Sequence, residues 1–121
     1  NTYIERKSLS DFIGTLSGGY ERFLNEIKRA EEDNAYLIVL IEDTLENASS
    51  FKYLPYISKK IRATPEFIFN RVRNLIQKHK HIQFLFVKGR RESTRVIEKI
   101  FTCGCAQKKI DLQLAYDKKI L

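Results

Sequence analysis

The chain opens with charged residues whose types and spacing could do chemistry. Glu5, Arg6 and Lys7 follow Thr2-Tyr3-Ile4, and Asp11 comes four residues after Lys7. Threonine, tyrosine and isoleucine favour an extended chain, and successive side chains of a strand point to opposite faces. Glu5 and Lys7 would therefore share one face of a strand, while Arg6 points to the other.

A carboxylate beside an ammonium group suits metal-assisted cleavage of a phosphodiester. The carboxylate can hold a hard divalent cation, and the ammonium can orient an attacking water or offset charge that develops on a phosphate. The chemistry needs at least one further acidic ligand, and Asp11, one turn into the next helix, comes close enough to join or support the cluster. Glu-x-Lys alone is also what an ordinary surface ion pair on an edge strand produces.

The elements that must position these residues alternate along the chain. The apolar runs Tyr36–Ile41 and Ile82–Val87, the second interrupted only by Gln83, predict strands buried on both faces, and Thr2–Ile4 could be the end of a third. Helical spacing predicts helices over Asp11–Leu16, from Gly19, from Thr64 and from about Glu92. Strands alternating with helices indicate an α/β fold with a partly parallel sheet.

The secondary structure of two segments is less clear, and two of the predicted helices have apolar faces that we expect to be buried. The stretch from Leu45 to Ala63 predicts a loop with a short helix, and the tail from Ile110 to Leu121 fits either a strand or a helix. The residues expected in the core are Ile68, Phe69, Val72, Leu75 and Ile76 of the third helix, and Val96, Ile97, Ile100 and Phe101 of the last.

The string ERKSLSD is more specific than its parts. Preceded by Tyr-Ile and followed by Phe-Ile and Ser-Gly-Gly-Tyr, it resembles the Glu-Arg-Lys-x-x-x-Asp signature of the XPF-type structure-specific nucleases. YLIVLIED and the stretch from Thr64 to Phe101 are similar in layout to the later elements of that family. The resemblance, which covers roughly Tyr3 to Phe101, implies a restriction-endonuclease-like core: an α/β fold with a central mixed sheet flanked by helices on both faces. Residues 1–121 would form a single nuclease-type domain.

The resemblance also implies roles for the site residues. Glu5 would be a metal ligand, Lys7 the catalytic lysine, and Asp11 a supporting acid and second metal ligand. Arg6 would hold the site together or contact phosphate. The cofactor would be Mg²⁺, for which Mn²⁺ can substitute. The family also carries a Gly-Asp on an upstream strand whose aspartate is a main metal ligand. We therefore expect that the sequence shown lacks this N-terminal strand, the alternatives being that another acid substitutes or that the domain is inactive.

Composition points to an acidic partner. Lys and Arg outnumber Asp and Glu by 22 to 15 in 121 residues, giving a formal charge of +7, and 43% hydrophobic content is enough for one core. With this positive charge, nucleic acid is favoured over a membrane surface. No apolar run approaches the roughly 20 residues that span a bilayer. The cysteines, Cys103 and Cys105, are interpreted as reduced thiols. With no signal-peptide pattern, we expect an intracellular protein: nuclear if eukaryotic, cytoplasmic if bacterial, archaeal or viral.

Two basic clusters are candidate nucleic-acid contacts, although a solvated surface would account for either. Lys88, Arg90 and Arg91 follow a predicted core strand directly. Aromatic and basic residues mix in the other cluster, which contains Tyr53, Tyr56, Lys59, Lys60 and Arg62.

The sequence thus supports a metal-dependent endonuclease acting on branched or flapped DNA in repair, recombination or replication. The alternative is a catalytically inactive DNA-binding or scaffolding subunit on the same fold, and RNA binding stays open because nothing reads the sugar. Members of the family usually pair through the nuclease domain, so we expect a homodimer or heterodimer. No glycine-centred helix-hairpin-helix module follows Phe101.

Overall fold

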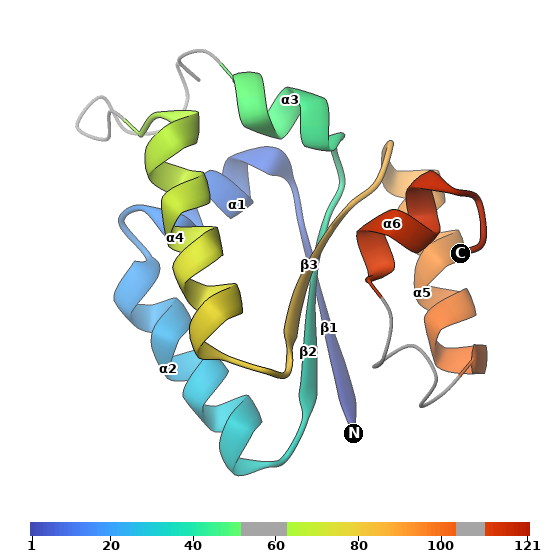
Figure 1. The fold of residues 1–121 in the computed structure, drawn as a ribbon, viewed down its shortest axis with the longest axis horizontal. Helices are drawn as coiled ribbons and strands as arrows, with labels where there is room; N and C mark the ends of the chain where they lie inside the picture. Colours follow the sequence, from blue (N-terminus) through green and yellow to red (C-terminus); the bar gives the residue numbers. More distant parts are fainter. Residues whose placement is uncertain (52–62, 104–110) are drawn as a thin grey trace.

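The computed structural model describes residues 1–51, 63–103 and 111–121, over which strands and helices alternate (Figure 1). The strands are β1 (Thr2–Lys7), β2 (Tyr36–Ile41) and β3 (Ile82–Phe86); the helices are α1 (Leu9–Leu16), α2 (Tyr20–Glu32), α3 (Leu45–Ser50), α4 (Pro65–Lys78), α5 (Arg90–Cys103) and α6 (Leu112–Asp117). Within this described part, no helix is both long and apolar enough to cross a membrane. The predicted basic cluster at Lys59, Lys60 and Arg62, with Tyr53 and Tyr56, lies outside the described residues.

The three strands are neighbours in one sheet of order β1-β2-β3, as the sequence predicted. Both pairings are parallel, and in the register Lys7 lies beside Ile41, which lies beside Phe86. Parallel neighbours need long crossover connections, and here each crossover contains helices. The expected mixed sheet is therefore not found among the described strands, which are all parallel.

Alternate residues of the buried strands belong to two separate apolar clusters. Leu37, Val39 and Ile41 pack with residues of α1, α2 and α4, whereas Ile38 and Leu40 pack with residues of α5 and α6. Because successive strand side chains point to opposite faces, these clusters cover the two faces of the sheet. Figure 1 shows the same division, with α1 to α4 on one side of the strands and α5 and α6 on the other.

Short polar side chains set the starts of four helices. The hydroxyl of Thr64 accepts a hydrogen bond from the Phe67 N–H at 3.2 Å, and Pro65 follows as the first residue of α4, confirming the predicted start. Ser8, Thr44 and Asp111 begin α1, α3 and α6 in the same way. The sequence left the tail ambiguous between a strand and a helix. The structure shows that the part after Asp111 forms the helix α6.

Two apolar residues predicted to be buried are exposed. Ile76 of α4 is 50% exposed and Phe101 of α5 is 58% exposed, whereas their neighbours Leu75 and Ile100 are buried. Helical spacing predicts the direction of an apolar stripe, but the width that is covered depends on the neighbouring elements. Both residues lie at the edge of their stripe.

Close packing at the turn between α1 and α2 sets where α2 lies. A Cβ atom at Gly19 would be 3.2 Å from the carbonyl oxygen of Gly14, and the Gly19 N–H donates to this same oxygen at 2.9 Å. A side chain at this position would require the Gly14 carbonyl to shift by a few tenths of an ångström. The turn therefore brings α2 back along the sheet directly after α1.

Candidate active site

Glu5 and Lys7 lie together near the carboxyl end of β1. The Lys7 Nζ is 3.7 Å from Glu5 Oε2, and the lysine side chain is only 18% exposed. Their separation by two residues on a strand places them on one face, as predicted. The structure therefore confirms the predicted closeness of this carboxylate and this ammonium group.

A second carboxylate, from α2, adjoins this pair. Burial raises the pKa of Glu5 above its usual value, and the negative charge of Glu26 raises this pKa further, while Lys7 opposes the rise. Two carboxyl groups that share a site disfavour simultaneous ionisation unless a positive charge joins them. Glu5 and Glu26 together therefore favour a proton or a cation between them.

Lys7 and Glu26 also line a polar hollow of about 450 Å³ between the end of β1 and the two helices α1 and α2. Asp11 and Arg22 contribute to the same wall. A larger hollow of about 570 Å³ lies along β3 and α4, but its lining is mostly apolar, with Val72 among its residues. Phosphodiester chemistry needs charged groups, so we take the smaller, polar hollow as the candidate site.

Asp11 lies at the rim of this hollow and has a structural role as well. Its N–H donates to the hydroxyl of Ser8, the N-cap of α1, at 3.1 Å, so Ser8 and Asp11 occupy the spacing of a capping pair. A carboxylate in the first turn is also favoured by the helix dipole. This local role accounts for part of the ERKSLSD string without any catalytic function.

Arg6 points away from Glu5 and Lys7, as its position on the strand predicts. Its Nη2 donates to Glu42 Oε2 at 2.8 Å, and the Glu42 N–H donates to the Lys7 carbonyl at 2.8 Å. This hydrogen bond from Arg6 lowers the pKa of Glu42, and the positive charge of Arg90 contributes a smaller part. Arg6 therefore ties the end of β1 to the segment that follows β2, and it is also among the residues that line the hollow.

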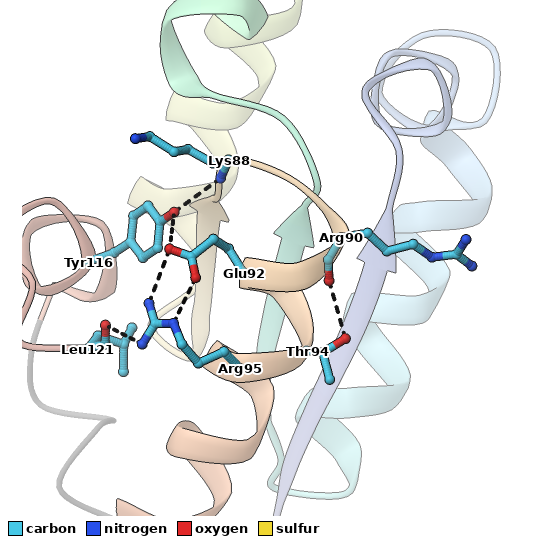
Figure 2. Close-up of polar contacts among 7 residues, drawn as sticks. All are labelled: Lys88, Arg90, Glu92, Thr94, Arg95, Tyr116 and Leu121. Atoms are coloured by element: carbon cyan, nitrogen blue, oxygen red, sulfur yellow. Dashed lines mark hydrogen bonds and ion pairs between the residues drawn. The ribbon is translucent and has the colours of Figure 1, made fainter.

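The predicted basic residues after β3 lie at the same edge of the sheet as Lys7. Lys88, Arg90 and Arg91 are all exposed. Figure 2 shows the side chains of Lys88, which precedes α5, and Arg90, the first residue of α5, extending in opposite directions, with Arg90 on the β1 side of the view. With strands about 4.8 Å apart, two strand spacings separate the ends of β1 and β3, a distance of roughly 10 Å.

Among the described residues, carboxylates could bind a hard divalent cation, but they do not form a complete set of protein ligands around it. Glu5 Oε2, the oxygen that lies 3.7 Å from Lys7 Nζ, is buried and has no hydrogen-bond partner among the described residues. In this described part of the chain, no group of three or more His, Cys, Asp or Glu is arranged to hold a metal ion, so Asp11 does not complete a three-acid cluster with Glu5 and Glu26. Mg²⁺ commonly uses one or two carboxylates with water and substrate phosphate, and Glu5 with Glu26 fits that pattern.

Sequence reasoning missed Glu26. Helical spacing marks it only as a charged residue beside the buried Phe23 and Ile27 of α2. A carboxylate next to an apolar stripe was the signal available in the sequence; the structure shows that Glu26 is half-buried. Its partner Glu5 could not be identified from that signal, because the contact depends on how α2 packs against the sheet.

The comparison with known families agrees with this geometry. Residues 1–100 match the family model of the ERCC4 domain. The chain therefore belongs to the ERCC4-domain family, which is the XPF-type nuclease domain, and this confirms the family resemblance of the sequence. No curated protein and no solved structure matches the chain. Membership of this family indicates a nuclease-type function in DNA repair or recombination, and it indicates DNA binding.

Proposed function

We propose that this domain is a divalent-metal-dependent endonuclease that hydrolyses phosphodiester bonds in branched or flapped DNA, on a restriction-endonuclease-like core. The observation that carries the proposal is the Glu5–Lys7 pair, 3.7 Å apart at the end of a strand, in a chain of the ERCC4-domain family. Lys7 and Glu26 line one polar hollow, and Glu5 lies beside both of them.

Each residue has a role in this proposal. Glu5 and Glu26 would hold the cation, and a bound Mg²⁺ or Mn²⁺ would act as a Lewis acid on the scissile phosphate. Lys7 would orient the attacking water and offset the charge that develops on the phosphate oxygens. Asp11 would support the water or the cation from the rim. Arg6 would position β1 through Glu42 rather than contact the reacting atoms.

Exposed cations at the same edge would hold the DNA. Lys88, Arg90 and Arg91 can each neutralise a backbone phosphate. A homodimer or heterodimer formed through this domain would present two such edges to a branched substrate. Lys59, Lys60 and Arg62, which lie outside the described residues, are further candidate DNA contacts from the sequence.

A second candidate function is a catalytically inactive DNA-binding or scaffolding subunit. It is favoured by one observation: the described residues contain no group of three acids placed for a metal ion. In that case the basic edge would keep its role while Glu5 and Lys7 form only an ion pair.

The test is cleavage of an end-labelled flap DNA with Mg²⁺ or Mn²⁺, using the longest natural polypeptide that contains residues 1–121. Glu5→Gln should abolish cleavage, and Lys7→Ala should slow it by roughly 10²- to 10³-fold because a charge is lost at the developing oxyanion. DNA binding measured in EDTA should stay within about twofold for Glu5→Gln, since the removed charge is negative.

Glu98→Gln is the matched control, because Glu98 is an exposed carboxylate on α5 outside the hollow. It should cleave like the parent. Cleavage by Glu5→Gln at the parent rate would exclude the assigned role of this carboxylate. A parent that binds flap DNA but never cuts any branched substrate would establish the scaffold function instead.

A further inference from the structure

A second charged hollow, of about 460 Å³, lies between α5 and α6 and takes no part in the candidate active site. Four cations from three parts of the chain line it: Lys88 after β3, Arg95 and Lys99 on α5, and Lys119 after α6. Two acids, Glu92 and Asp117, line it as well. The partners of these two acids decide what the hollow can bind.

Both acids already have partners within the protein. Glu92 accepts hydrogen bonds from Arg95 Nε at 2.7 Å and from the Tyr116 hydroxyl at 3.3 Å (Figure 2). Asp117 Oδ1 accepts a hydrogen bond from Gln113 Nε2 at 3.2 Å. Arg95 is the cation that balances Glu92, and its Nη1 also donates to the Leu121 carbonyl at 3.1 Å.

The three lysines are not balanced in this way. Across the parts of the chain that the structure describes, the ion pairs involve Arg6, Lys7, His79 and Arg95, and none involves Lys88, Lys99 or Lys119. All three lysines are exposed, and Figure 2 shows the Lys88 side chain extending away from the Glu92 carboxylate. The hydrogen bond from Arg95 lowers the pKa of Glu92, and the positive charge of Lys88 contributes a smaller part, but among the described residues none of the three ammonium groups forms an ion pair with the carboxylates of the hollow.

Lys119 occupies a backbone position that ordinarily favours glycine. Its φ is 60°, and the Lys119 and Ile120 N–H groups donate to the carbonyls of Tyr116 and Ala115 at 3.0 and 2.9 Å. This is the Schellman ending of a helix, in which the left-handed residue is usually glycine. A lysine here carries a conformational cost that a glycine would not, and it brings an ammonium group to the wall of the hollow.

We propose that this hollow, which shares Lys88 with the basic edge, binds phosphate groups of a nucleic-acid backbone on the opposite face of the sheet from the proposed site of cleavage. Lysine ammonium groups bind phosphate as point charges, and those that have no protein partner gain most from doing so. The hollow lies on the α5–α6 face of the sheet, while Glu5 and Lys7 lie with α1 and α2 on the other side, so it would hold a second stretch of backbone. In naming DNA as the ligand, the inference rests on the proposed function.

The experiment compares two glycine variants at adjacent positions. Lys119→Gly removes a lysine that lines the hollow, and Lys118→Gly removes a neighbouring exposed lysine that does not, so both change the net charge equally. Binding to a labelled flap DNA is followed by fluorescence anisotropy in EDTA, where no cleavage can occur, and over a series of salt concentrations. A loss of DNA binding, measured in EDTA, can therefore be distinguished from a loss of cleavage.

Lys119→Gly should weaken binding by roughly three- to tenfold and lower the log–log salt slope by about 0.9, the value for one phosphate that is no longer neutralised. Its melting temperature should be unchanged or higher, because glycine suits the left-handed position. Lys118→Gly should bind within about twofold of the parent. Lys99→Gln, which leaves the turn untouched, should weaken binding like Lys119→Gly.

A second arm separates backbone phosphate from free phosphate as the ligand. Inorganic phosphate is titrated while the melting temperature is followed. Equal binding losses in Lys119→Gly and Lys118→Gly, or no loss in either, would overturn the inference. A phosphate-dependent stabilisation that is lost in Lys119→Gly while DNA binding is kept would overturn the nucleic-acid assignment in favour of a small phosphate ligand.

Discussion

At the scale of single residues, the three charges at the end of β1 have different partners because they point in different directions. Glu5 and Lys7 lie together beside the polar hollow, and Glu26 joins them from α2. Arg6 points the opposite way and bonds Glu42. Because neighbouring strand residues point to opposite faces, the residues proposed for catalysis, Glu5 and Lys7, lie on one face and the Arg6–Glu42 contact lies on the other.

The Arg6–Glu42 pair should make stability depend on pH. Because the hydrogen bond from Arg6 lowers the pKa of Glu42, the pair stabilises the fold above the unfolded-state pKa of about 4.3, and this contribution is lost as the pH falls through the lower folded-state pKa. Arg6→Ala should lower the free energy of unfolding by about 0.5–1 kcal/mol at neutral pH, since the arginine is well exposed. The difference from the parent should shrink as the solution is acidified below that range.

Urea unfolding at neutral pH and at successively lower pH measures this difference. Arg73→Ala is the control, because Arg73 is exposed on α4 and none of the ion pairs among the described residues involves it. A constant difference between parent and Arg6→Ala at every pH would mean that packing of the arginine stem, and not its charge, accounts for the loss.

At the scale of elements, α6 covers the outer edge of β3. The Gln113 side chain accepts a hydrogen bond from the Phe86 N–H at 2.7 Å and donates to the Phe86 carbonyl at 3.1 Å, as the backbone of a neighbouring strand would. The Tyr116 hydroxyl accepts from the Lys88 N–H at 3.1 Å, one step further along. An open strand edge is a template for unwanted pairing, so this contact protects the edge as well as anchoring α6.

Removing the Gln113 amide should leave both Phe86 backbone groups without their partner. Gln113→Ala is expected to cost about 1–3 kcal/mol of stability, the usual range for leaving a buried donor or acceptor unpaired. The Phe86 amide should also exchange its hydrogen faster, which NMR can follow at that single residue. Leu114→Ala is the control, because Leu114 on the same helix is 56% exposed. Unchanged exchange at Phe86 would show that α6 does not protect the edge.

At the scale of the whole molecule, the excess of positive charge should govern association with DNA. A formal charge of +7, with Lys88, Arg90 and Arg91 exposed at one edge, favours contacts with backbone phosphate. Such contacts release counterions, so affinity falls with salt. This term is independent of the chemistry at Glu5.

Binding to flap DNA should therefore weaken steeply between 50 and 200 mM salt, by about 100-fold if roughly four phosphates are neutralised. Replacing Arg90 and Arg91 with alanine should lower the log–log salt slope by about 0.9 for each phosphate that is no longer neutralised. Anisotropy titrations measure both, with Arg73→Ala again as the control. We also expect flap and junction DNA to compete better than plain duplex. Equal, salt-insensitive binding to all of these would count against a phosphate-binding edge.

The sequence by itself determined what depends on near neighbours along the chain. The apolar runs of β2 and β3, the capped start of α4 at Thr64 and the shared face of Glu5 and Lys7 follow from local periodicity and capping. Alternation of strands with helices then indicated the α/β fold, and the ERKSLSD string indicated the family. These are properties of spacing over a few residues, which the backbone geometry fixes.

Only the tertiary structure decided which distant residues meet. Glu26 reaches Glu5 because of where α2 lies against the sheet, and Arg6 reaches Glu42 because β1 and β2 are in register at their ends. The α5–α6 hollow forms because α6 folds back over the edge of β3. The same packing left Ile76 exposed at the edge of an apolar stripe. Periodicity gives each element a direction, but contacts between elements depend on their relative placement, which the summed packing of the whole core determines.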